Sequence, residues 1–182
     1  MRKKINSFVV FMSRTPVIIV LAIIYLVVQT LIAVIVSPLG HDMLRVQTTF
    51  SGETFRGIIQ SWEKSGLMAL YLKHFYLDYF HPVIYSLFLS ALLSRGLVMN
   101  GLDKKFNLLV LLPFAAGLMD LIENSMHLYL IHNPAEISAG TVLFSGICTT
   151  MKWAMAFLVL VGAIVLIVMG LAKKKIIEGT LQ

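Results

Sequence analysis

Four long apolar stretches alternate with short polar segments along the chain. They cover residues 17–36, 67–93, 106–131 and 140–172. An apolar run of about eighteen residues or more, with few charges, is long enough to cross the hydrocarbon core of a bilayer as a helix. The pattern therefore predicts an all-α fold, a polytopic membrane four-helix bundle formed by a single integral membrane domain over residues 1–182.

The longest segment outside the predicted spans, residues 37–66, has a helical pattern of its own. Ser51 is a predicted N-cap, and Gly66 is a predicted end of the helix. Between them apolar residues recur at i, i+3, i+4 and i+7, at Phe55, Ile58, Ile59 and Trp62. This spacing predicts a short amphipathic extracytoplasmic helix between spans one and two. It is either a lid at the membrane surface or a packing element that caps the bundle.

Composition and charge agree with a membrane protein. The chain is 58% hydrophobic and 13% charged, whereas about a quarter of the residues of a soluble domain are charged. The net charge of +6 arises largely from Lys and Arg at the two ends and in the loop between spans two and three. Such clusters mark cytoplasmic segments, so we expect both termini to be cytoplasmic and no nucleic-acid partner. The single cysteine, Cys148, excludes an internal disulfide.

The third predicted span carries a stripe of polar side chains. At about 100° per residue, its four polar residues fall within an arc of about 100°. They are Asp120, Glu123, Asn124 and His127. Because ionisable groups inside a membrane span are costly, they are expected to be functional.

The second predicted span carries a similar stripe and a proline. Five residues share an arc of about 80°, and they are Tyr71, His74, Asp78, His81 and Tyr85. Pro82 is expected to kink this span, because a proline cannot donate the helical backbone hydrogen bond.

The polar residues of all four spans lie at similar depth. At a rise of 1.5 Å per residue, they are about 20–33 Å from the cytoplasmic ends of their spans. Span one contributes Gln29, and span four contributes Thr149 and Lys152. We therefore expect one buried polar pocket at the depth of the outer leaflet.

Charge is unbalanced in this predicted pocket. Lys152 can neutralise one of the acids Asp78, Asp120 and Glu123. The remaining negative charge requires protonated carboxyls, a charged histidine, or a bound cation or cationic ligand.

Binding is the first class of function that fits. The pocket would hold a lipid head group, an ion or a partner subunit, and the expected partners are membrane lipid, another membrane protein or a second copy of the chain. The predicted ligand-binding residues are Gln29, His74, Tyr85, Asn124, Thr149 and Lys152.

Catalysis is the second class. A membrane-embedded acid/base or metal-dependent enzyme would act on a lipid or isoprenoid substrate. Its candidate catalytic residues are Asp120, Glu123, His127, Asp78 and His81, and the same five would be the ligands of a bound metal. A haem between His74 and His127 is a further alternative, and a purely structural ion-pair cluster is another. The sequence identifies no cofactor and leaves open whether the protein is an enzyme.

A longer pattern spans most of the chain. It comprises Val46-Gln47, Trp62, Asp78, Pro82, Tyr85, Asp120-x-x-Glu123-Asn124 and Lys152-Trp153. This pattern resembles that of small, uncharacterised bacterial four-span integral membrane proteins. The resemblance implies a multi-pass protein of the bacterial plasma membrane, and it carries no function.

Overall fold

The computed structural model describes residues 2–180, and the side chains of residues 2–176. The chain is all-α, with four candidate membrane-spanning helices packed together, so the predicted fold class is confirmed. The four candidate spans are Thr15–Leu39, His81–Asn100, Lys104–His132 and Ala139–Ile176.

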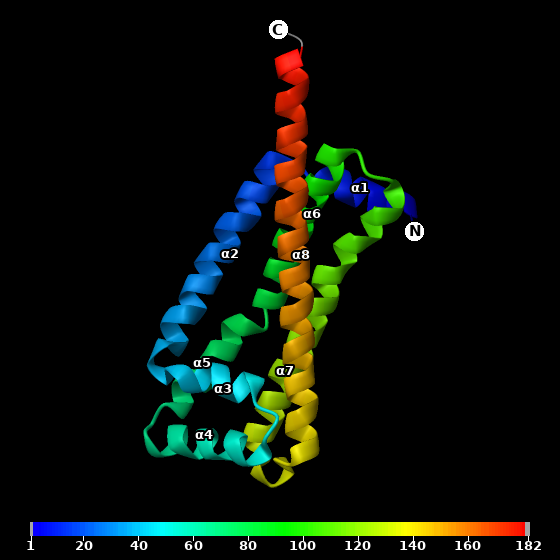
Figure 1. Cartoon of the computed structure of the whole chain (residues 1–182). Helices are drawn as coiled ribbons and strands as arrows, with labels where there is room; N and C mark the ends of the chain where they lie inside the picture. The colour runs from blue at the N-terminus through cyan, green and yellow to red at the C-terminus, as the bar shows by residue number, and fades with distance from the viewer. Residues whose placement is uncertain (1, 181–182) are drawn as a thin grey trace. The chain divides into compact units, whose positions relative to one another are not determined.

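The elements follow one another as shown in Figure 1. In chain order they are α1 (Arg2–Met12), α2 (Thr15–Val36), η1 (Ser37–Leu39), α3 (His41–Thr48), α4 (Gly52–Lys64), α5 (Met68–Asp78), α6 (His81–Asn100), η2 (Lys104–Leu111), α7 (Leu112–His132), η3 (Pro134–Glu136) and α8 (Ala139–Thr180). Two compact units divide the described chain. The first unit comprises residues 2–25, 83–115 and 154–180, and the second unit comprises residues 26–82 and 116–153.

In the first unit, buried serines of α6 bond to the backbone where η2 passes into α7. The Ser86 hydroxyl donates to the Pro113 carbonyl at 2.7 Å, and the Ser90 hydroxyl donates to the Val110 carbonyl at 2.8 Å. Lipid offers no water to a buried hydroxyl, so these carbonyls serve as acceptors for the two serines.

The second unit has an apolar core beneath α4. The Ser51 side chain accepts a hydrogen bond from the Thr54 backbone N–H at 3.2 Å, which confirms the predicted N-cap. The four apolar residues predicted to share a face are buried in a cluster with residues of α5, α7 and α8, and they are Phe55, Ile58, Ile59 and Trp62. Gly66, at a φ of 74°, follows the helix. The amphipathic pattern was therefore correct, and α4 is a packed element of the second unit.

The second predicted span is not one kinked helix, and in this respect the prediction was wrong. Helix α5 ends at Asp78 and α6 begins at His81, so Pro82 lies in the first turn of a new helix. Proline is tolerated there because the first backbone N–H groups of a helix have no helical partner. Within a continuous helix, Pro82 would have left the Asp78 carbonyl without a donor. The Asn124 side-chain amide donates to that carbonyl instead, at 3.1 Å.

Candidate functional site

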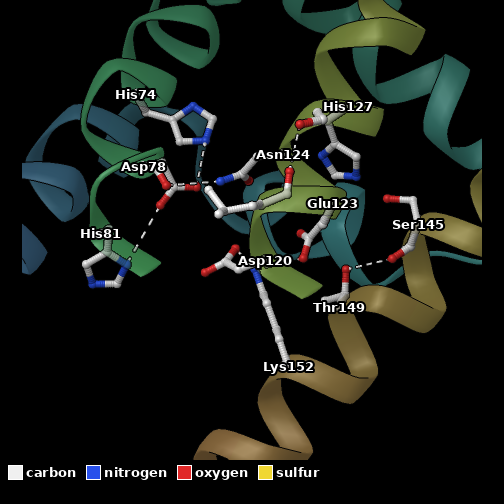
Figure 2. Close-up of polar contacts among 12 residues, drawn as sticks. His74, Asp78, His81, Asp120, Glu123, Asn124, His127, Ser145, Thr149 and Lys152 are labelled. Atoms are coloured by element: carbon white, nitrogen blue, oxygen red, sulfur yellow. Dashed lines mark hydrogen bonds and ion pairs between the residues drawn. The ribbon is translucent and has the colours of Figure 1, made fainter. Parts of the chain in front are cut away.

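Polar side chains from α5, the first residue of α6, α7 and α8 come together in the second unit (Figure 2). We call this set the polar cluster, and it comprises His74, Asp78, His81, Asp120, Glu123, Asn124, His127, Ser145, Thr149 and Lys152. All are buried except His81, which is half-buried. Helix α5 presents His74 and Asp78, and α6 presents His81 at its start. Helix α7 presents the stripe of span three, and α8 presents the remainder.

Lys152 joins two carboxylates of α7. Its Nζ lies 2.7 Å from Asp120 Oδ1 and 2.8 Å from Glu123 Oε2. The two acids are three residues apart and therefore share one face of α7. Both ion pairs are nearly closed to solvent, since the three side chains are 8%, 6% and 0% exposed. This ammonium group therefore contacts one oxygen of each carboxylate.

Two histidines flank the third carboxylate. His74 Nε2 lies 3.8 Å from Asp78 Oδ2, and His81 Nδ1 lies 3.9 Å from Asp78 Oδ1. Asn124 follows Glu123 in α7 and donates to the Asp78 backbone, so it links this group to the lysine group. The cluster therefore contains two groups, the two acids around Lys152 and Asp78 with its two histidines, and α7 connects them.

Tyr71 connects the cluster to the apolar core. Its hydroxyl lies 2.7 Å from His127 Nδ1, and its ring packs against Trp62 with centroids 4.6 Å apart. Burial raises the pKa of Tyr71, and the nearby Glu123 and Asp78 carboxylates raise it further. The phenol therefore stays protonated and donates to His127.

The contacts of His74 show which of its ring nitrogens carries a hydrogen and which faces a carboxylate. His74 Nδ1 contacts the Tyr71 carbonyl, which can only accept, so Nδ1 carries the hydrogen. Burial lowers the pKa of His74, and the Asp78 carboxylate only partly opposes this shift. In a neutral His74 ring, the lone pair of Nε2 would face the Asp78 carboxylate. The contact becomes favourable when a proton resides on Nε2 or on the carboxyl group.

Several buried polar atoms of the cluster lack hydrogen-bond partners. Among the residues that the structure describes, they include His127 Nε2, Ser145 Oγ and Glu123 Oε1. Because Tyr71 donates to His127 Nδ1, the neutral His127 ring carries its hydrogen on Nε2. An unpaired buried donor of this kind costs about 1–3 kcal/mol unless a ligand or water satisfies it.

The structure brings together most of the residues proposed from the sequence. Gln29 is half-buried in α2 and makes no hydrogen bond or ion pair with the cluster within the described part of the chain. Tyr85 is buried in the first unit. The Thr149 hydroxyl donates to the Ser145 carbonyl at 3.2 Å. Tyr71 lay on the predicted stripe of span two, but its bond to a histidine of another helix was not predicted.

The arrangement gives no support to a metal or haem centre. Within residues 2–180, no three His, Cys, Asp or Glu side chains lie in a geometry suited to a metal ion. Tyr71 stacks on the His74 ring, with centroids 4.9 Å apart, and bonds to His127. Both histidines proposed as haem ligands are thus held by one tyrosine.

Comparison with known proteins adds no family. No family model, no curated protein and no solved structure matches the chain. The structure itself shows four packed helices, each long and apolar enough to cross a membrane, and charged residues buried in the protein.

Proposed function

We propose that the protein is a multi-pass membrane protein that binds a small cation, a proton or an alkali ion, at the polar cluster. One observation carries this proposal: three buried carboxylates, Asp78, Asp120 and Glu123, are matched by one buried lysine. With neutral histidines, full ionisation of the acids would leave two negative charges uncompensated. Each unpaired charge in the bilayer costs about 2.5–3.5 kcal/mol at its centre, so uptake of positive charge is favourable.

The geometry favours a cation over an anionic lipid head group. The lysine that would bind a phosphate is already held at 2.7 Å and 2.8 Å by Asp120 and Glu123. Asp78, in contrast, faces two histidines whose charge depends on protonation. An incoming cation would therefore lie near Asp78, and an incoming phosphate would have to displace a carboxylate.

Positive charge at the chain ends and in the loop after α6 supports a placement in the membrane. We propose that both termini and that loop are cytoplasmic, because Lys and Arg gather in these segments. The polar cluster and α4 then belong to the extracytoplasmic half, within reach of ions from outside the cell.

Infrared difference spectroscopy of the purified protein tests the proposal. Between alkaline pH and about pH 6, where solvent-exposed carboxyls remain ionised, and with choline as the only other cation, we expect a protonated-carboxyl band that Asp78→Asn removes. If the bound ion is instead sodium or potassium, adding that ion at alkaline pH should raise thermal stability, and Asp78→Asn should abolish the rise. Glu63→Gln, on the exposed side of α4, is the matched control and should change neither signal. Carboxylates that stay ionised throughout, with no stabilisation by either ion, would overturn the proposal.

An acid/base enzyme acting on a lipid or isoprenoid is the second candidate. It is favoured by the buried, unpartnered His127 Nε2, which lies on the same helix as two carboxylates. Such a donor can protonate a substrate or position its oxygen. Under this alternative, His127→Gln abolishes turnover of an added lipid while the cation-dependent signals persist.

A further inference from the structure

A small cavity lies in the first unit, where α1 meets the start of η2. It has a volume of about 150 Å³ and is lined by Arg2, Ile5, Asn6, Asp103, Lys104, Lys105 and Leu108. This volume is several times the roughly 30 Å³ of a water molecule in the liquid. It is below the roughly 300 Å³ at which pockets take drug-sized ligands. The cavity therefore suits one compact polar group.

The lining is cationic. Arg2, Lys104 and Lys105 bring three positive groups against the single carboxylate of Asp103. Lys105 Nζ lies 3.8 Å from Asp103 Oδ2, and both side chains are more than 60% exposed, so this pair is weak. Arg and Lys together are the usual protein ligands of a phosphate group. The side chains of Ile5 and Leu108 add an apolar wall.

The cavity is held open by ordered contacts. The Asn107 side-chain amide donates to Asn6 Oδ1 at 2.9 Å, which ties η2 to α1. The Asp103 carboxylate accepts a hydrogen bond from the Lys105 backbone N–H at 2.9 Å, which fixes the turn that carries both lysines. A preformed site loses less conformational entropy when a ligand binds.

The cavity lies where a membrane helix begins. Lys104 is the first residue of a candidate span. Helix α1 beside it exposes Val10 and Phe11, which are 58% and 51% accessible. Exposed apolar residues on a short helix with basic residues at one end are typical of an interfacial helix. The basic groups are thus expected at the level of lipid phosphates.

From these observations we propose that the cavity binds the phosphodiester head group of one anionic phospholipid, with the acyl chains outside along Ile5 and Leu108. The proposal is independent of cation binding at the polar cluster, since every lining residue belongs to the first unit. Anionic lipid is favoured over free phosphate because the site opens at a membrane helix and has an apolar wall.

Native mass spectrometry of the full chain, extracted from membranes and titrated with phosphatidylglycerol or phosphatidylcholine, tests this proposal. We expect one phosphatidylglycerol to be retained per chain in preference to phosphatidylcholine. Lys104→Gln/Lys105→Gln should weaken its binding about thirtyfold, since each basic group at a lipid surface contributes about fivefold. The matched control is Lys173→Gln/Lys175→Gln, which removes the same charge from α8 and should leave the retained lipid in place.

A second variant separates binding from folding. Asp103→Asn keeps a side-chain oxygen for the Lys105 backbone but removes the one negative charge of the lining, so it should bind phosphatidylglycerol more tightly. A third arm adds inorganic phosphate, which should not displace the lipid. Three results would overturn the proposal: equal retention of both lipids, equal losses in the α8 control, or binding of inorganic phosphate alone.

Discussion

The two units bury polar side chains of different kinds. In the first unit, within the described residues, the buried residues classed as polar are the serines Ser13, Ser86, Ser90 and Ser94. In the second unit they include every buried acid, histidine and lysine of the described chain. A hydroxyl on a membrane helix can bond to a backbone carbonyl and carries no charge to compensate. The first unit thus buries polar groups that carry no charge, whereas the second retains charge at a cost that packing alone does not explain.

Removing the lysine should have the largest effect on this contrast. Lys152→Met leaves Asp120 and Glu123 buried without their counter-charge, so we expect the free energy of unfolding to fall by about 3–5 kcal/mol. Unfolding in mixed micelles by a denaturing detergent measures it. Lys73→Met is the control, because Lys73 is exposed on α5 of the same unit, and its effect should be near zero. If Lys152→Met were as stable as the parent protein, the two ion pairs of Lys152 would contribute nothing to stability.

Removing the tyrosine hydroxyl should have the next largest effect. Tyr71→Phe keeps the ring packing against Trp62 but leaves His127 Nδ1 buried without its donor. The expected loss is about 1–3 kcal/mol in the same unfolding assay. Tyr76→Phe serves for comparison, since Tyr76 is 79% exposed and its hydroxyl should contribute little. Equal losses in the two variants would argue against the buried bond.

The second unit should also respond to pH through His74. Its pKa is lowered in the folded state by burial, so the unfolded chain binds this proton first as pH falls below about 6.5. The stability from a neutral His74 is complete above that pH. It is lost on acidification by at most about 1.4 kcal/mol per pH unit. His74→Gln should reduce this pH dependence of the free energy of unfolding. His132→Gln, at an exposed histidine, should leave it unchanged. If His74→Gln left the pH dependence of the unfolding free energy unchanged, that dependence would have to arise from other groups.

A serine of the first unit should give the smallest effect. Ser90→Ala removes the donor to the Val110 carbonyl, and we expect a loss of about 1 kcal/mol. Because no charge is involved, this loss should be the same at neutral and mildly acidic pH. A loss that changes with pH would mean that a titrating group contributes to the stability of the first unit.

The sequence predicted the elements whose patterns are local. The spacing of Phe55, Ile58, Ile59 and Trp62, with a capping serine before it, was sufficient to define the buried face of α4. The polar stripe of α7 likewise followed from helical periodicity. In each case the residues that decide the outcome lie within a few turns of one another.

Relations between helices could not be predicted in the same way. Depth selected Gln29 and periodicity selected Tyr85, but neither determines how each helix is rotated about its axis or which neighbours it meets. The break between α5 and α6 depends on a donor for the Asp78 carbonyl, and that donor, Asn124, is 46 residues away. The separation of α1 from α2 and the short helix α3 lacked an apolar pattern strong enough to reveal them.

The bond between Lys152 and Asp120 has a consequence for how the protein is made. Asp120 leaves the ribosome 32 residues before its partner. A translocon that released α7 alone into lipid would have to insert two unneutralised acids, at about 2.5–3.5 kcal/mol each at the bilayer centre. We therefore expect α7 and α8 to enter the membrane together as a hairpin, with the lysine contacting both acids and compensating one of their two charges at the moment of insertion.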